Sequence, residues 1–186
     1  MDIGVRRRFT IADYHRMGDV GILGCDERLE LIDGELIVRE PIGSHHAGTV
    51  TRVSRLWTLR LGQRALVSIQ NPLVLPNVDS ELQPDVTILA PRADFYTTSH
   101  PLPADVLLLI EVADTSLRLD RRVKLPLYAR AGIREAWLCD LTTGRIEVHR
   151  EPTAQGYGAV RVHGRGASLA AVAFPDLALT VDDLLG

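Results

Sequence analysis

A carboxylate that closes a strongly apolar run constrains this chain more than any other feature of its sequence. Residues 107–110 are all apolar, Glu111 follows them directly, and a stretch rich in basic residues leads on to Lys124. A short apolar run of this kind predicts a strand that is buried on both faces of a sheet. Burying a carboxylate there is costly unless it is paired or binds a metal ion. Residues 107–124 are therefore the first candidate for a functional site.

The length and composition predict an ordinary globular protein of one domain. The chain has 186 residues, of which 46% are hydrophobic and 24% are charged. The net charge of −3 argues against a protein that coats nucleic acid without specificity, although it leaves room for a local basic groove. Cys25 and Cys139 form no CxxC motif, so we expect no disulfide framework, no structural zinc site and a reducing cytoplasm. We also expect no signal peptide and no membrane span, since no apolar run approaches roughly 18 residues.

Residues 30–40 predict a β-hairpin near the N-terminus. Asp33 and Gly34 form the two-residue turn that is the strongest short-range signal for a hairpin. Glu35 opens the second strand, where its carboxylate either points into a cleft or is solvated at the surface.

A long helix is predicted over residues 45–62, with Ser44 as its N-cap. His46 begins a stripe at helical spacing that continues through Val50, Val53, Trp57 and Leu61. A cationic imidazole opposes the helix dipole at an N-terminus, so we expect His46 to favour its neutral form. Neutral imidazole can bind a metal ion or relay a proton, and the alternative is a capping or hydrogen-bonded histidine of the core.

Two further strands precede the apolar run. The first, over residues 65–75, is interrupted by Pro72, which predicts a bulge or a sheet edge. Gln70 stands just before this break and either faces the site or merely ends a strand. Gln83 and Asp85 begin the second strand, in which Asp85 lies on the face opposite the apolar side chains.

A helix is predicted over residues 117–131, where Pro126 should kink it or split it in two. Its apolar stripe is expected to consist of Leu119, Val123, Leu127 and Ala131. Its surface is basic, with Arg118, Arg121, Arg122, Arg130 and Arg134. These arginines form either a solvated face or a phosphate-binding patch. We favour the patch, because bases beside acidic strand ends would focus the electric field on a polyanion.

The order of the predicted elements indicates a mixed sheet with helices on both faces. On such a sheet, Asp85 and Glu111 can lie side by side on adjacent strands. Two close carboxylates suit a hard divalent cation such as Mg²⁺, which prefers oxygen ligands and keeps several waters. A bound ion would activate water for phosphodiester hydrolysis, and Lys124 would hold that water or offset developing charge.

With these residues in place, the sequence resembles a known group of proteins. Pro84-Asp85, followed by Glu111 on the next strand, resembles the PD-(D/E)XK nuclease superfamily. More closely, the chain resembles the Uma-type family of “putative restriction endonucleases”, formerly a domain of unknown function. The motifs are ELIDGE (30–35), SHHA (44–47), QPD (83–85), EVADTSL (111–117), D-x-x-x-K (120–124), LYARAGI (127–133) and EAWLCDL (135–141). This ordered set is specific and covers nearly the whole chain, whereas Pro84-Asp85 alone carries no weight.

The resemblance implies an α/β fold with an α+β mixed sheet. Its restriction-endonuclease-like core has the order α-β-β-β-α-β, with an N-terminal hairpin and a C-terminal β extension. We expect one such domain over residues 1–186. Its parts are an N-terminal helix and loop (1–28), the nuclease core (29–141) and C-terminal strands with a tail (142–186).

The resemblance also implies roles for single residues. Asp85 and Glu111 match the metal-binding acids. The superfamily lysine usually stands two residues after the second acid, but Ala113 occupies that position. Lys124 looks like the migrated lysine of this family. A lysine delivered from a helix must reach the attacking water with the right geometry, so activity depends on where Lys124 points.

Four more positions match the family by resemblance. Glu35 corresponds to an additional acid from the hairpin, and His46 to a helix histidine near the site. Gln70 and Gln83 correspond to polar positions that line the cleft.

We therefore expect an endonuclease that hydrolyses DNA with Mg²⁺ or Mn²⁺ in the cytoplasm and pairs as a homodimer. A competing hypothesis is a nuclease-fold protein that binds nucleic acid or a protein partner without cutting. Ala113 in place of the lysine and the negative net charge motivate it. A third hypothesis is an enzyme that acts on a small phosphorylated substrate.

Overall fold

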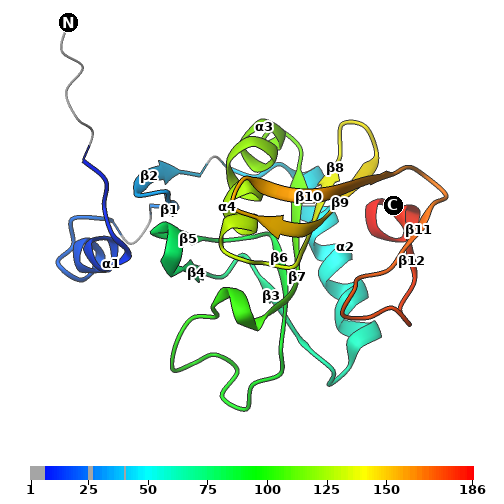
Figure 1. The fold of residues 1–186 in the computed structure, drawn as a ribbon, viewed down its shortest axis with the longest axis horizontal. Helices are drawn as coiled ribbons and strands as arrows, with labels where there is room; N and C mark the ends of the chain where they lie inside the picture. The colour runs from blue at the N-terminus through cyan, green and yellow to red at the C-terminus, as the bar shows by residue number, and fades with distance from the viewer. Residues whose placement is uncertain (1–6, 25–26, 40) are drawn as a thin grey trace, which may run out of the picture.

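A six-stranded sheet lies at the centre of the chain in a computed structural model that describes residues 7–24, 27–39 and 41–186 (Figure 1). Its strands lie in the order β10-β9-β8-β7-β6-β3. Their bounds are Leu66–Ile69 (β3), Val86–Leu89 (β6), Val106–Ala113 (β7), Glu135–Asp140 (β8), Arg145–Thr153 (β9) and Gly156–His163 (β10). β7 and β8 are parallel, and the other neighbours are antiparallel. The sheet is therefore mixed, as the sequence predicted.

The N-terminal hairpin belongs to a second sheet, with the order β2-β1-β5-β4 among the described strands. The bounds are Leu29–Ile32 (β1), Glu35–Val38 (β2), Leu73–Leu75 (β4) and Ser80–Leu82 (β5), and the short helix η1 (Pro76–Val78) joins β4 to β5. Asp33 and Gly34 form the turn with φ angles of 49° and 76°, so the predicted hairpin is confirmed.

The strand predicted over residues 65–75 is in fact two strands that lie in different sheets. β3 is an edge strand of the six-stranded sheet, whereas β4 is an edge strand of the second sheet. Gln70 has a positive φ of 50° between them, and Pro72 follows. A proline cannot donate to a strand ladder, and both strands beside it are edge strands, so the sheet edge is confirmed among the two alternatives that we expected.

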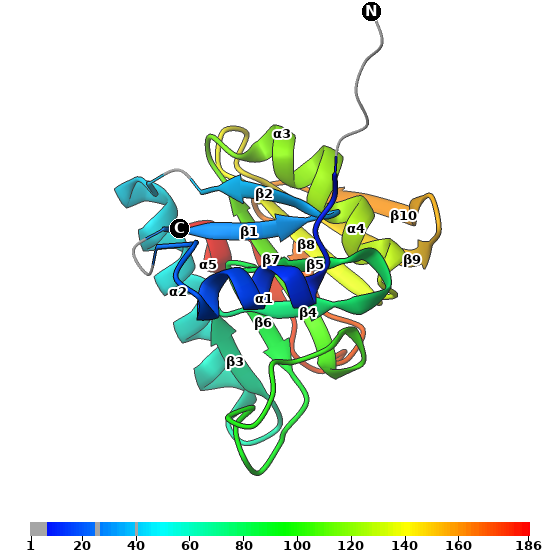
Figure 2. The ribbon, with the colours of Figure 1, turned by 90° about the vertical axis from the view of Figure 1, so that its left-hand side faces the viewer.

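Two helices cover one face of the six-stranded sheet. α2 (Ser44–Leu61) buries all five residues of its predicted stripe, and α5 (Val181–Leu185) packs beside it. The N-cap of α2 is Gly43 rather than the predicted Ser44, which lies inside the helix. The tail also forms a short two-stranded sheet from β11 (Ser168–Leu169) and β12 (Leu179–Thr180). At the other end of the chain, α1 (Ile11–Asp19) lies against the four-stranded sheet (Figure 2).

The helix predicted over residues 117–131 is interrupted before Pro126 by a π-helical turn. α3 (Leu117–Leu119) is followed by a π-helical turn, η3 (Asp120–Lys124), and then by α4 (Leu125–Arg130). Pro126 has no N–H for the carbonyl four residues before it, and the N–H of Leu125 instead donates to the carbonyl of Asp120. The wider turn shifts the buried face to Asp120 and Lys124. Val123, which we expected in the apolar stripe, is exposed.

Alternation along β7 divides the core between the two faces of the sheet. Leu108, Ile110 and Val112 pack against α2, whereas Leu109 and Ala113 pack against α4 and the second sheet. Glu111 shares the face of Leu109 and Ala113, so its carboxylate meets α4 and the π-turn. A helix, η2 (Pro103–Asp105), precedes β7 after the loop that follows β6.

Two further expectations can be compared with the described residues. No helix in the described ranges is long and apolar enough to cross a membrane. Cys139 is buried with a free thiol, whereas Cys25 lies outside the described residues. The division of the domain at residues 28 and 141 stays a prediction.

Two buried tryptophans provide a test of the core. Trp57 and Trp137 are both fully buried and lie 5.8 Å apart between ring centroids. The Trp137 indole N–H donates to Glu135 Oε1 at 2.8 Å, whereas the Trp57 indole N–H has no partner among the described residues. We predict that Trp137→Phe lowers the free energy of unfolding by roughly 1.5–3 kcal/mol more than Trp57→Phe, because it removes a hydrogen bond to a charged group. Urea denaturation of both variants measures this difference, and equal losses would contradict it.

Candidate functional site

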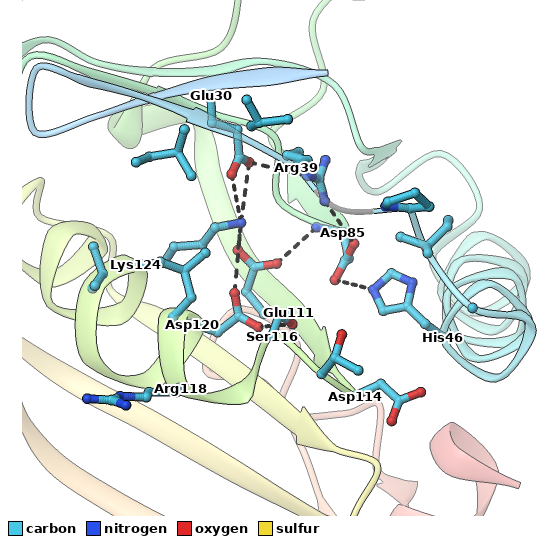
Figure 3. Close-up of a pocket in the computed structure, with 18 of the residues that line it drawn as sticks. Glu30, Arg39, His46, Asp85, Glu111, Asp114, Ser116, Arg118, Asp120 and Lys124 are labelled. Carbon is cyan, nitrogen blue, oxygen red and sulfur yellow. Dashed lines mark hydrogen bonds and ion pairs between the residues drawn. The ribbon is translucent and has the colours of Figure 1, made fainter. Parts of the chain in front are cut away.

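A cavity of about 920 Å³ lies between the N-terminal hairpin, the first turn of α2 and the α3–η3 segment (Figure 3). Five charged residues at its inner end are each less than 4% exposed, namely Glu30, Asp85, Glu111, Asp120 and Lys124. We call the four acids among them the carboxylate cluster. Charged groups are rarely buried so fully unless they are paired, so this cavity is the candidate site.

Asp85 and Glu111 lie side by side, in the arrangement that the sequence predicted. Asp85 stands directly before β6, and antiparallel pairing of Val86 with Ile110 brings it beside Glu111. The Asp85 N–H donates to Glu111 Oε2 at 3.3 Å, and the Val112 N–H donates to Asp85 Oδ2 at 2.9 Å. The backbone of the two strands therefore fixes both carboxylates.

Side chains from two other elements hold the Asp85 carboxylate. His46 Nε2 lies 3.0 Å from Asp85 Oδ2, and the Gln70 amide donates to Asp85 Oδ1 at 3.1 Å. Arg39 lies 3.7 Å from the same Oδ1. Burial acts to raise the pKa of Asp85, but the hydrogen bonds from His46, Val112 and Gln70 hold that pKa below its ordinary value.

His46 departs from the expectation of a histidine held neutral by the helix terminus. Its hydrogen bond to Asp85 raises the pKa of the imidazole, even though burial acts to lower it. A carboxylate 3.0 Å away is a nearer influence than the helix dipole. The other ring nitrogen, Nδ1, is buried and has no hydrogen-bond partner among the described residues.

Glu111 has a different electrostatic environment. Its Oε1 accepts a hydrogen bond from the Tyr128 hydroxyl at 2.6 Å and lies 3.5 Å from Lys124 Nζ. Burial raises the pKa of Glu111 to about 8, because Lys124 only partly offsets the desolvation of the carboxylate and nearby acids add to it. Lys124 therefore does not fully offset the burial of Glu111 and the charge of the acids near it.

Lys124 is the centre of the carboxylate cluster. Its Nζ lies 3.2 Å from Glu30 Oε2, 3.5 Å from Glu111 Oε1 and 3.8 Å from Asp120 Oδ1. Burial acts to lower the pKa of Lys124, but the three carboxylates outweigh it and raise the pKa above its ordinary value. The π-turn places Asp120 and Lys124 on the same buried side, so the predicted Lys124 does converge with Asp85 and Glu111.

The hairpin acid that lines the cavity is Glu30, whereas the predicted Glu35 does not line it. Glu30 pairs with Ile37 in the hairpin, and both line the cavity. Glu35 pairs with Ile32 on the same face of the hairpin, two residues nearer the turn than the pair of Glu30 and Ile37. Glu35 is not among the lining residues. Along β2, Glu35 thus lies two residues before Ile37, which does line the cavity.

The predicted substrate-binding residues divide into two groups. Arg118 and Arg122 line the cavity, but Arg121 does not, because it pairs with Glu147 at 2.5 Å and with Asp140 at 3.4 Å. Arg121 therefore faces β8 and β9.

The two predicted glutamines lie next to the acids. Gln70 contacts Asp85 as described above. The Gln83 N–H donates to Glu30 Oε1 at 2.7 Å, and its side-chain oxygen accepts from Arg39 at 3.4 Å. Both glutamines therefore orient charged groups of the site.

Glu30, Arg39, Asp120 and Tyr128 were missed as site residues by the sequence reasoning. For Tyr128, a signal was present, because it stands four residues after Lys124 on a helical segment. For Arg39, we find no signal in the sequence pattern, since it follows a short strand and meets Glu30 only through the hairpin geometry.

Acidic groups outnumber basic groups at the inner end of the cavity. The four acids of the carboxylate cluster face Arg39 and Lys124 and, beside Asp85, the imidazole of His46, whose pKa is raised. No three His, Cys, Asp or Glu side chains in the described ranges are arranged to hold a metal ion by themselves. Asp85 and Glu111 are nevertheless two adjacent oxygen donors, and Mg²⁺ is often held by only one or two carboxylates, with water and phosphate completing its shell.

Comparison with known proteins gives one family and a similar solved structure. The model of the family Uma2, described as “Putative restriction endonuclease”, matches residues 11–182. A crystal structure of a “putative nuclease belonging to DUF820” from Anabaena variabilis ATCC 29413 is 14% identical in sequence. The similarity covers 95% of this chain and 97% of that one with a TM-score of 0.73, which establishes a shared fold. No curated protein matches the chain.

The central lysine leads to a prediction about stability. We predict that Lys124→Met lowers the free energy of unfolding by about 3–5 kcal/mol, because it leaves buried carboxylates without their cation. Arg122→Met serves as the matched control, since Arg122 is exposed and should change stability by at most about 0.5 kcal/mol. Chemical denaturation compares the two variants.

A second substitution separates the charge from the packing of Lys124. Glu30→Gln combined with Lys124→Met removes one of the uncompensated carboxylates, so it should recover part of the lost stability. A double variant that is less stable than Lys124→Met alone would contradict the charge-balance explanation.

Proposed function

The chain belongs to the Uma2 family of “putative restriction endonucleases”, and from that premise we propose that it is a metal-dependent endonuclease that hydrolyses phosphodiester bonds in DNA. One observation carries the proposal: Asp85 and Glu111 are adjacent and buried at the inner end of a large cavity, beside Lys124. The proposal includes a cytoplasmic protein. It also includes a homodimer.

The donor set fits Mg²⁺ or Mn²⁺. Asp85 and Glu111 would hold the ion through carboxylate oxygens, which are the ligands that hard divalent cations prefer. The acids of the carboxylate cluster outnumber the basic groups around them, which favours a cation at this position. When bound, the ion would supply an activated water and stabilise negative charge on the phosphate.

The residues around the two acids have supporting roles. His46 and Gln70 orient the Asp85 carboxylate, and Tyr128 orients Glu111. Such partners of metal ligands fix the direction of their lone pairs. Lys124 lies close enough to Glu111 to offset charge that develops on the scissile phosphate.

Lys124 can take the place of the lysine that the superfamily usually has at the position of Ala113. The reason is geometric. Ala113 and Glu111 lie two residues apart on β7 and share the face that α4 and the π-turn cover. An ammonium group at position 113 and one from the π-turn would therefore approach Glu111 from the same side of the sheet.

A second candidate function is a protein of this fold that binds nucleic acid without cutting it. The observation that favours it is the state of Lys124, which is 3% exposed and held by three carboxylates. Salt-dependent DNA binding that needs no metal and survives Asp85→Ala would support this candidate. Turnover of small phosphate esters but not of DNA would instead indicate the third hypothesis.

The two proposed metal ligands give the first test of function. We predict that Asp85→Asn and Glu111→Gln each lower DNA cleavage in Mg²⁺ or Mn²⁺ by more than roughly 100-fold, since loss even of a residue that supports a ligand costs about 10–100-fold. Asp114→Asn is the control, because Asp114 lines the same cavity but contacts neither acid in the described interactions. Gel assays on several DNA forms measure cleavage, and calorimetry measures metal binding. Absence of binding at millimolar metal would contradict the proposal.

His46 gives a second, separate test. We predict that His46→Ala weakens Mn²⁺ binding and cleavage by about 10–100-fold, because Asp85 loses a positioning hydrogen bond. His46→Gln keeps a side-chain donor and should recover part of both. A loss of cleavage with unchanged Mn²⁺ affinity would exclude the positioning role.

A further inference from the structure

The acids of the site lie too deep for a phosphate on the outside of an intact duplex. Asp85 and Glu111 are 2% and 1% exposed, so a phosphodiester reaches them only by entering the cavity. A DNA duplex is stiff over roughly 150 base pairs, and its stacked bases hold the backbone on the outside. Enzymes that do chemistry on a base, which lies inside the stack, use single strands or take the nucleotide out of the stack, and a recessed site sets a similar requirement here.

The entrance of the cavity has apolar side chains on two opposing segments. Ile37, Val38 and Ile42 come from β2 and the residues after it, and Leu119 and Val123 come from the α3–η3 segment. Val38 and Val123 are 73% and 36% exposed although they are large and apolar. Walls of this kind suit the faces of a nucleobase, which stack between apolar side chains in pockets for unpaired nucleotides.

The size of the cavity also fits a nucleotide. A cavity of about 920 Å³ lies in the range of roughly 300–1,000 Å³ that encloses ligands of this size.

The charges at the entrance complement a DNA strand. Arg118 and Arg122 line the cavity and are exposed, and Arg118 extends away from the carboxylates in Figure 3. They can contact phosphates that flank the nucleotide inside, because guanidinium groups bind phosphate oxygens well. The acidic inner end repels further phosphates, which limits entry to a short segment.

We propose that the substrate of this site is DNA with unpaired nucleotides, one of which enters the cavity with its base between the two apolar walls. The inference rests on the proposed function in taking DNA as the ligand, and it specifies which form of DNA is bound.

Binding of matched oligonucleotides tests the inference without cleavage. Three DNAs of the same sequence are compared by fluorescence anisotropy in Ca²⁺: a perfect duplex, a duplex with a three-nucleotide bulge, and the single strand. We expect the bulged and single-stranded forms to bind at least about tenfold tighter than the duplex, which corresponds to the contribution of about one stacked base. A 2-aminopurine in the bulge should change its fluorescence on binding, and the same label in the paired region should not.

Substitutions at the walls give a matched comparison. Val38→Asp and Val123→Asp should each weaken binding of the bulged DNA by about tenfold and leave duplex binding unchanged. Val160→Asp is the control, because Val160 is 50% exposed on β10 and lies outside the cavity lining. Circular dichroism confirms that each variant is folded, and two independent wall positions keep the test valid if one variant unfolds.

The outcomes separate this inference from the proposed function. Equal binding and cleavage of all three DNAs would overturn the inference and leave the endonuclease proposal intact. Preference for unpaired DNA without cleavage in any metal would support the inference and contradict the hydrolytic function. Binding of inorganic phosphate or a mononucleotide as tightly as the bulged DNA would overturn the inference in favour of a small-phosphate site.

Discussion

The ion pairs of one buried lysine are the interaction on which the rest of the site depends. Lys124 lies within 4 Å of Glu30, Glu111 and Asp120, which come from the hairpin, the central strand and the π-turn. Carboxylates lose a large hydration free energy when they are buried, and only a close cation offsets that loss. One ammonium group therefore joins three separate elements, and the cavity exists where they meet. The excess of acids over bases at this place is the reason why we propose a divalent cation as a ligand.

A proline explains how the chain delivers that lysine. Pro126 removes one backbone donor, and the turn before it widens into a π-helical turn that places Asp120 and Lys124 toward the acids. Such insertions are frequent at functional sites, because they rotate side chains without ending the helix. The same rotation exposes Val123 at the cavity entrance. Local backbone chemistry thus determines both the charged inner end and one apolar wall.

The parts of the site that follow from strand patterns could be predicted from the sequence. The apolar run before Glu111 predicted a buried strand, and alternation placed Asp85 on the pleat opposite Val86. The proximity of Asp85 to Glu111 then followed from the pairing of neighbouring strands. The contribution of Glu30 could not be predicted, because Glu30 and Glu35 lie on the same face of the hairpin and only its placement decides between them. The second sheet was missed because β4 and β5 have three residues each, too few for a periodic pattern.

We propose that Asp85 and Glu111 together hold a divalent cation. The most direct measurement is a crystal structure of the protein soaked with Mn²⁺, in which anomalous scattering locates the ion independently of any activity. We expect an anomalous peak within coordination distance of both carboxylates, at the inner end of the cavity. A structure with millimolar Mn²⁺ and no peak there, or with a peak that contacts neither acid, would contradict it.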